Sequence, residues 1–186
     1  MVGAAIVLGL VGCGGAAESP SPPASSAPAG ASLPPRPVEL RLDGVDPCSL
    51  LTVAQRAQLG VNGGLSVPST HVTSLSGDSC TWSNLPETPD NAYLGRTVLG
   101  QGAEYASGRE PLRVVDGFAA TTSGSTGTDP AHYCAVLVDV APGQSLLAQY
   151  GNGRKDYPGM NHQLACDKAQ QLASDMLGTL RAIKHR

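Results

Sequence analysis

Alternating apolar positions define the clearest strand of this chain. Cys134, Val136, Val138 and Val140 are spaced two residues apart, so they share one face of a strand over residues 133–140. A second apolar run over residues 145–150 follows after Ala141-Pro142-Gly143-Gln144. Pro followed by Gly at the centre of such a connection is typical of a type II turn. The pattern predicts an antiparallel hairpin.

The end of the chain changes to a helical period. From about His162 to Ile183 the apolar residues recur at spacings of three and four, which places them on one stripe of an amphipathic helix. The members of the stripe are Cys166, Ala169, Leu172, Ala173, Met176, Leu177, Leu180 and Ile183. We therefore expect one face of this helix to pack on a sheet.

Helix signals also open the domain. Asp46 followed by Pro47 suits a cap and a first helical position. Thr52 with Gln55 three residues later forms a capping-box pattern, and Gly60 is a suitable stop. We expect a short helix that ends near residue 59.

Further strands are predicted between the two helices. The candidate runs are residues 65–67, 80–83, 93–99 and 112–122, the last interrupted by Asp116-Gly117 as a bulge or a turn. The order of elements predicts an α+β fold. It is a single antiparallel sheet of about five strands, with the short N-terminal helix and the long C-terminal helix packed on it.

The N-terminus has the pattern of an exported lipoprotein. An apolar run over residues 4–13 ends in Leu10-Val11-Gly12-Cys13, which resembles a bacterial lipobox. This pattern predicts a signal peptide over residues 1–12 and a lipid group on Cys13. Two acyl chains on that cysteine would suffice to hold the protein on a membrane. No Lys or Arg precedes Cys13, so we expect the true start codon to lie upstream.

A linker follows the predicted lipid site. Seven prolines fall between Pro20 and Pro37 among Ser, Ala and Gly, and no charge occurs between Ser19 and Pro35. Such a composition buries too little apolar surface to order itself. We predict a disordered tether over residues 13–44 and one folded domain over residues 45–186.

Composition excludes two classes of partner. The net charge is −3 and charged residues make up 15% of the chain, with no cluster of Lys and Arg. A nucleic-acid binder would need a basic surface, so no nucleic-acid partner is expected. The same balance argues against binding to anionic lipid head groups.

The four cysteines that remain after Cys13 predict two disulfides, because an even count is typical of an exported domain. Cys134 lies on the apolar face of the hairpin strand and Cys166 on the apolar stripe of the last helix, so these two sulfurs point toward one core. We predict Cys134–Cys166, and Cys48–Cys80 as the remaining pair. There is no Cys-x-x-Cys and no pair of histidines at helical spacing, so no metal or cofactor is predicted.

These motifs together resemble those of a known family. The lipobox, the Ser/Pro-rich tether, Asp46-Pro47-Cys48, Cys80-Thr81-Trp82 and the later Cys134 and Cys166 are similar to the pattern of actinobacterial lipoproteins grouped as a domain of unknown function. The resemblance covers nearly the whole chain and implies an exported, disulfide-bonded lipoprotein. Its motifs are structural, so it implies no reaction and no catalytic residue.

Catalytic signals are weak. Gly143-Gln144-Ser145 lacks the second glycine of a hydrolase elbow, and Ser79 lies beside a predicted disulfide with no helix after it. His132, near Asp129, would need an orienting partner in space to act as a base. Trp82 is a candidate stacking platform, although we favour a core position for it. No catalytic residue is predicted.

An exposed recognition surface is the alternative to chemistry. Tyr150, Arg154 and Tyr157 flank a polar loop, and Tyr and Arg are common anchors of interfaces. We expect a monomeric, membrane-anchored lipoprotein on the extracytoplasmic face that binds an envelope protein or a small ligand. The alternatives are an extracellular hydrolase with a non-standard site and a structural or antigenic envelope component.

Overall fold

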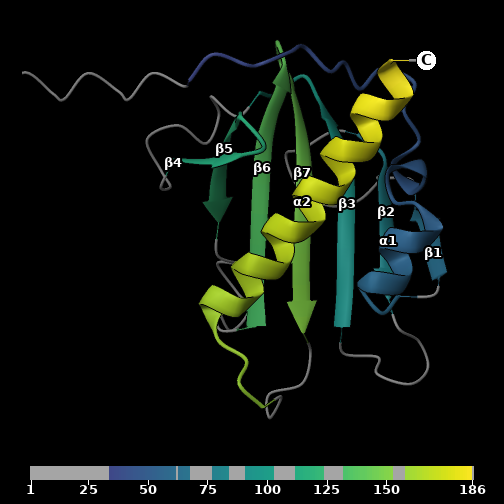
Figure 1. The fold of residues 1–186 in the computed structure, drawn as a ribbon, viewed down its shortest axis with the longest axis vertical. Helices are drawn as coiled ribbons and strands as arrows, with labels where there is room; N and C mark the ends of the chain where they lie inside the picture. Colours follow the sequence, from purple (N-terminus) through teal and green to yellow (C-terminus); the bar gives the residue numbers. More distant parts are fainter. Residues whose placement is uncertain are drawn as a thin grey trace, which may run out of the picture.

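One antiparallel sheet with a long helix laid across it forms the centre of the molecule. The computed structural model describes residues 34–61, 63–67, 77–83, 91–102, 112–123, 132–152 and 158–185. Within these residues the sheet has seven strands in the order β1-β2-β3-β7-β6-β5-β4, and α2 crosses one face of it diagonally (Figure 1). The predicted α+β class is confirmed.

The elements have the following bounds. The strands are β1 Gly63–Val67, β2 Ser79–Ser83, β3 Asn91–Leu99, β4 Leu112–Val115, β5 Phe118–Ser123, β6 Tyr133–Ala141 and β7 Gln144–Asn152. The helices are the 3-10 helix η1 Pro47–Leu50, α1 Val53–Gln58 and α2 His162–Lys184.

The sheet has more strands than the sequence predicted because the run over residues 112–122 folds back on itself. Asp116 and Gly117 both have positive φ, at 48° and 88°. Two successive residues in that region make the tight turn that hairpins prefer, rather than a bulge. The run therefore forms two paired strands, β4 and β5.

The short N-terminal helix is in two parts. The Asp46 carboxylate accepts the Cys48 N–H at 2.9 Å and caps η1. Thr52 then starts α1 through the predicted capping box, in which the Gln55 N–H donates to Thr52 Oγ1 at 3.2 Å and the Thr52 N–H donates to Gln55 Oε1 at 2.8 Å. Leu51 is extended, and this breaks the helix between its two caps.

The predicted hairpin of residues 133–150 is confirmed as β6 and β7, joined by Pro142-Gly143. Gly143 has a φ of 66°, the positive value that a type II turn requires at its third position. Strand β7 pairs with β3 on its other edge, so the hairpin lies at the middle of the sheet.

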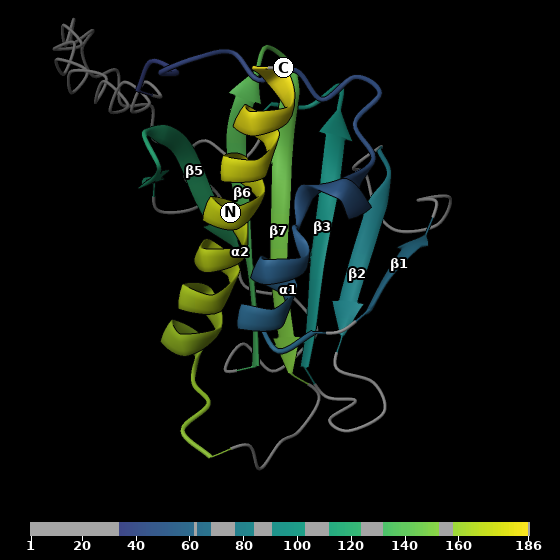
Figure 2. The same ribbon diagram turned by 45° about the vertical axis from the view of Figure 1, so that its right-hand side comes forward.

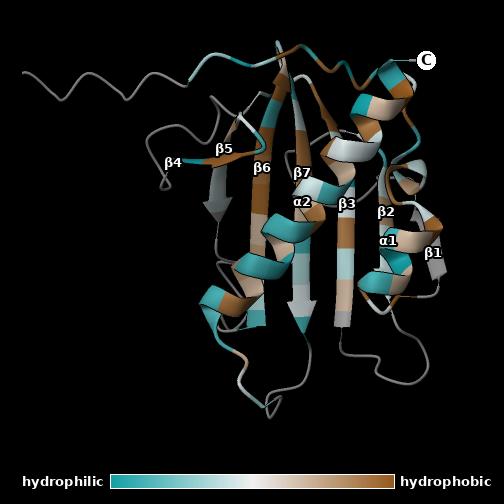
Figure 3. Ribbon diagram, viewed as in Figure 1, coloured by the Kyte–Doolittle hydropathy of each residue, from teal (hydrophilic) through white to brown (hydrophobic). Residues whose placement is uncertain are grey.

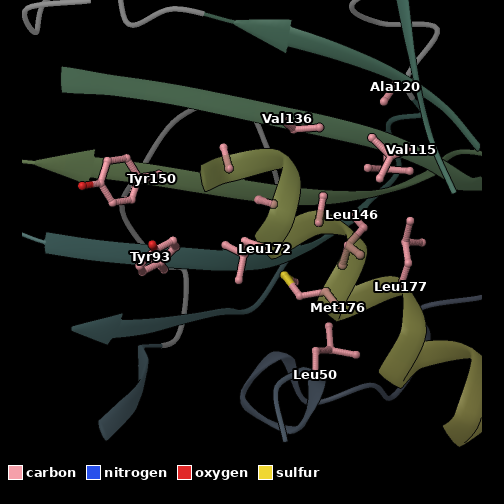
Figure 4. Packing of buried hydrophobic residues seen from close by; sticks show 14 of the residues in the cluster. Leu50, Tyr93, Val115, Ala120, Val136, Leu146, Tyr150, Leu172, Met176 and Leu177 are labelled. Atoms are coloured by element: carbon pink, nitrogen blue, oxygen red, sulfur yellow. The ribbon is translucent and has the colours of Figure 1, made fainter. Parts of the chain in front are cut away.

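The hydrophobic core lies between the sheet and α2. Figure 3 shows apolar residues along β6 beneath the helix, whose outward turns are mostly polar. Figure 4 shows Leu172 and Met176 of α2 reaching toward Leu146 of the sheet. Trp82 belongs to this cluster and has no exposed surface, which confirms its predicted core position.

A glycine on β3 lets the helix approach closely. A Cβ added at Gly95 would lie 2.5 Å from Met176 Cε and 2.9 Å from Trp82 Cη2. Both distances are far below van der Waals contact, so a larger residue here would push the two core side chains apart.

The folded domain begins earlier than predicted. Leu40 and Leu42 are each 1% exposed and belong to the core. The Leu40 N–H donates to the Val140 carbonyl at 2.8 Å, and Arg36 Nε lies 2.7 Å from Asp139 Oδ2. We call residues 36–44 the N-terminal strap. The predicted tether boundary at residue 44 is wrong, since the strap is part of the domain; residues 13–33 lie outside the described residues.

Two disulfides join the layers as predicted. Cys48–Cys80 links η1 to β2, and Cys134–Cys166 links β6 to α2. Among the residues that the structure describes, no helix has the length and apolar character needed to cross a membrane.

Candidate functional site

A hollow lies between α1 and α2 above β3, and we call it the helix hollow. Its volume is about 250 Å3. The residues that line it are Gln58, Leu59, Tyr93, Asp167, Lys168 and Gln171. They come from three separate elements, so the site exists only in the folded domain.

Tyr93 lines the helix hollow, and the buried Tyr150 packs against it from behind. The ring centroids of Tyr93 and Tyr150 are 5.0 Å apart with a tilt of 57°, within the range of favourable aromatic pairs. Figure 4 shows the two rings on neighbouring strands, at the opposite end of the core from Leu177. Tyr93, supported by Tyr150, gives the hollow an aromatic base.

Tyr150 is therefore not part of an exposed recognition surface, and that prediction is wrong. The register of the sheet places Tyr150 opposite Tyr93 and Cys134, on the face that α2 covers. Its exposed fraction is 0%. The other two residues of that predicted surface, Arg154 and Tyr157, lie outside the described residues, as do Cys13 and Asp129.

Charged residues of α2 form the rim of the helix hollow. Lys168 Nζ lies 5.3 Å from the centroid of the Tyr150 ring, a cation–π distance. Asp167 is exposed beside it, and its Oδ1 accepts a hydrogen bond from Gln163 Nε2 at 2.7 Å. The rim thus presents a cation, an anion and the amides of Gln58 and Gln171 around an aromatic base.

The rim offers groups that can bind a polar ligand. The lining residues supply one ammonium, one carboxylate, two amides and a phenol. A cation and an anion on adjacent residues suit a ligand that carries both an acceptor and a donor group. Sequence reasoning missed the site because its residues are far apart in the chain.

A second hollow, of about 270 Å3, lies between α2 and the β4–β5 turn. Its lining residues are Val115, Asp116, Asp167, Gln170, Gln171 and Ser174. Ser174 Oγ donates to Asp116 Oδ2 at 2.7 Å, and Arg181 Nη2 donates to the Asp116 carbonyl at 2.7 Å. These bonds fix the turn to the helix, so we interpret this hollow as a packing feature.

The opposite face of the sheet carries a polar group that the sequence did not single out. Arg96 is only 6% exposed, and the Gln149 amide donates to the Tyr133 hydroxyl. Burial raises the pKa of Tyr133, while the charge of Arg96 and the hydrogen bond from Gln149 oppose that rise. Apolar residues surround the group on this face: Val98, Ala135, Leu137 and Leu147.

One histidine lies against a disulfide. His162 Nε2 is 3.5 Å from Cys166 Sγ, and the ligand atoms of Cys134, His162 and Cys166 all lie within 4.8 Å of one another. The sequence had offered no paired histidines for a metal. It did contain a His and a Cys four residues apart on one helix, which is the signal that could have found this cluster.

Comparison with known proteins gives one match. The family model described as "Protein of unknown function (DUF3558)" matches residues 8–179. No curated protein and no solved structure matches the chain.

Proposed function

This chain belongs to the DUF3558 family of proteins of unknown function, and we propose that it is a binding module held at the cell envelope by a lipid on Cys13. The observation that carries the proposal is the helix hollow, with Lys168 above the Tyr93–Tyr150 pair. The fold supports a binding role because disulfides and a continuous core hold the elements that bear the hollow.

The size of the helix hollow limits its ligand. A volume of about 250 Å3 is just below the roughly 300–1,000 Å3 of drug-sized pockets. It suits a small molecule or one side chain of a partner protein. A carboxylate or phosphate of the ligand would pair with Lys168 and a donor group with Asp167, while apolar atoms would contact Tyr93 and Leu59.

The test uses matched lysine variants. The full-length protein is expected to enrich a specific envelope component in a pull-down from intact envelope, and Lys168→Ala is expected to reduce that enrichment severalfold. Lys184→Ala is the control, since Lys184 is an exposed lysine of the same helix outside the hollow. Equal enrichment by both variants, or by a peptide of the tether alone, would remove the helix hollow as the binding site.

Membrane anchoring is tested separately. The apolar run, the lipobox pattern and the Pro-rich segment support a lipid group on Cys13. Growth with a clickable fatty acid is expected to label the protein and not its Cys13→Ser variant. Equal labelling of the two, or labelling of neither, would contradict the anchor while leaving the binding proposal open to its own test.

Neither hollow favours a hydrolase. The lining residues of both contain carboxylates and amides, and the hydroxyls among them are those of Tyr93 and Ser174, of which Ser174 is the one aliphatic hydroxyl. That hydroxyl donates to Asp116 instead of being activated by a histidine. If the folded domain enriches nothing in the pull-down, that result would instead support a structural envelope component without a ligand.

A further inference from the structure

We propose that Cys134, His162 and Cys166 form a redox-gated Zn2+ site. In the oxidised protein Cys134 and Cys166 form a disulfide, and His162 lies beside it. On reduction, the two thiolates and the imidazole become three ligands for one metal ion. This site is separate from the helix hollow and does not depend on it.

The backbone places the three ligands from two elements. His162 is the first residue of α2 and Cys166 lies one turn further, so both side chains share one side of the helix. Cys134 is the second residue of β6, and the packing of α2 on the sheet brings it to the same point. A pair four residues apart on a helix is a common arrangement for chelating zinc.

One of the three ligand distances already matches a tetrahedral zinc site, and the other two need small shifts. Zinc binds imidazole nitrogen at about 2.0–2.1 Å and thiolate sulfur at about 2.3 Å, so a tetrahedral N···S separation is about 3.6 Å. His162 Nε2 and Cys166 Sγ are already 3.5 Å apart. The two sulfurs must part to about 3.8 Å once their bond is broken, and Cys134 Sγ, which lies within 4.8 Å of the ligating nitrogen of His162, must reach about 3.6 Å from it; side-chain rotation can supply both shifts.

Reduction and metal binding balance as two steps. A dithiol reductant transfers two electrons and two protons to the Cys134–Cys166 disulfide, yielding two thiols and the disulfide of the reductant. Zn2+ then displaces the two thiol protons to water and accepts a lone pair from neutral His162. Three protein ligands leave one position of the tetrahedron for water.

Access and selectivity follow from burial. Cys134 is fully buried and Cys166 is 4% exposed, whereas His162 is exposed, so a metal would enter from the side of His162. The sulfurs of the intact disulfide are uncharged and bind zinc poorly, so the oxidised protein should not hold the ion. Within the described part of the chain, no such third ligand accompanies Cys48–Cys80.

The test follows Co2+, a coloured substitute for Zn2+. Full-length protein is reduced with a phosphine, freed of it under argon and titrated with Co2+, next to oxidised protein. We expect one Co2+ per reduced chain with thiolate-to-cobalt absorption in the near ultraviolet, and none in the oxidised sample. His162→Gln should weaken binding by about tenfold or more, while His185→Gln, at the exposed end of α2, should not.

Three outcomes would overturn the proposal: no Co2+ binding by reduced protein, equal binding by oxidised protein, or unchanged affinity in His162→Gln. A Cys48→Ser/Cys80→Ser variant shows whether the other thiols contribute, and its binding should equal that of the parent. Circular dichroism of the same samples shows whether the chain unfolds when its disulfides are reduced. If the reduced chain unfolds, Co2+ should restore its structure, and failure to do so would also refute the site.

Discussion

Asp175 shows how one partly buried carboxylate affects the whole helix pair. Its Oδ1 accepts a hydrogen bond from Gln171 Nε2 at 3.2 Å, and its carbonyl accepts one from Gln55 Nε2 at 3.1 Å. Burial raises the pKa of Asp175, and the negative charge of Asp116 adds to the rise against the hydrogen bonds from Gln171 and Gln55. The charged form is therefore less stable in the folded protein than in the unfolded chain.

This shift predicts a pH-dependent effect of Asp175→Asn. The native pKa of Asp175 lies above its unfolded value, so between these two pKa values the folded state binds more protons than the unfolded chain. The free energy of unfolding therefore falls as the pH rises through that range. At pH 7 the variant should be more stable than the parent, by less than about 1 kcal/mol because the group is only partly buried. Below the ordinary carboxyl pKa of about 3.9 the gain should disappear.

Urea unfolding near pH 7 and near pH 3 measures this difference. Asp167→Asn is the control, because Asp167 is an exposed carboxylate of the same helix. A variant that is less stable than the parent at pH 7 would mean that the hydrogen bond from Gln171 outweighs the cost of burying the charge.

The cysteines and Tyr150 show which residue positions the sequence predicts correctly and which it does not. The alternation of the strand placed Cys134, and the helical spacing placed Cys166, in one core, and this was sufficient to predict their disulfide. Tyr150 follows the same alternation, since it lies on the same face of β7 as Leu146 and Ala148. The polar loop that follows Tyr150 in the sequence suggested that this residue is exposed. The alternation along the strand, however, determines the face of the sheet on which each side chain lies.

At the scale of elements, the N-terminal strap joins the domain through both backbone and side chains. The Leu42 N–H donates to Gln144 Oε1 at 2.6 Å, and Gln144 Nε2 donates to Asp43 Oδ2 at 2.9 Å. Figure 2 shows the strap passing over the end of the sheet where β6 turns into β7. The strap thus closes the end of the core between the sheet and the last turns of α2.

The strap predicts that residues of the supposed linker support the fold. Leu40→Ala should lower the free energy of unfolding by about 2–4 kcal/mol, because it removes a fully buried leucine from the core. Val38→Ala is the matched control two residues away, where the side chain is 39% exposed, and it should change stability by less than about 0.5 kcal/mol. Urea unfolding of the parent, Leu40→Ala and Val38→Ala gives the comparison. Equal stabilities of all three would mean that the strap does not contribute to the folded domain.

The elements that could be predicted are those with a strong period. Helix α2 and the β6–β7 hairpin have regular apolar patterns over many residues and were predicted to within a few residues. The strap has an alternating pattern too, with Leu40 and Leu42 between Glu39, Arg41 and Asp43. The Pro-rich composition around the strap predicts a tether, whereas the burial of Leu40 and Leu42 depends on contacts with Val140 and Gln144 that are distant in sequence.

At the scale of the whole molecule, the N-terminal strap and the helix hollow lie at opposite ends of the sheet. The strap lies at the Ala141–Gln144 end of the β6–β7 hairpin, and Tyr93 pairs with Tyr150 near the other end of β7. Figure 2 shows the start of α2 at that other end, away from the strap. The lipid anchor proposed on Cys13 would attach the domain at the strap end, and the helix hollow would then lie at the end of the sheet away from that attachment.

The two disulfides stabilise the molecule as a whole, and their contributions can be compared. Each joins cysteines separated by 32 residues, so the chain-entropy model assigns both the same stabilisation, about 3.5–4 kcal/mol. Cys48→Ala/Cys80→Ala and Cys134→Ala/Cys166→Ala should then lower the free energy of unfolding by similar amounts, within about 1 kcal/mol of each other. The two bonds nonetheless hold different contacts, since one ties η1 to β2 and the other ties α2 to the middle of the sheet. A larger loss for the second pair in urea unfolding would therefore show that the helix–sheet packing of the native state, rather than loop closure in the unfolded chain, sets the contribution of that bond.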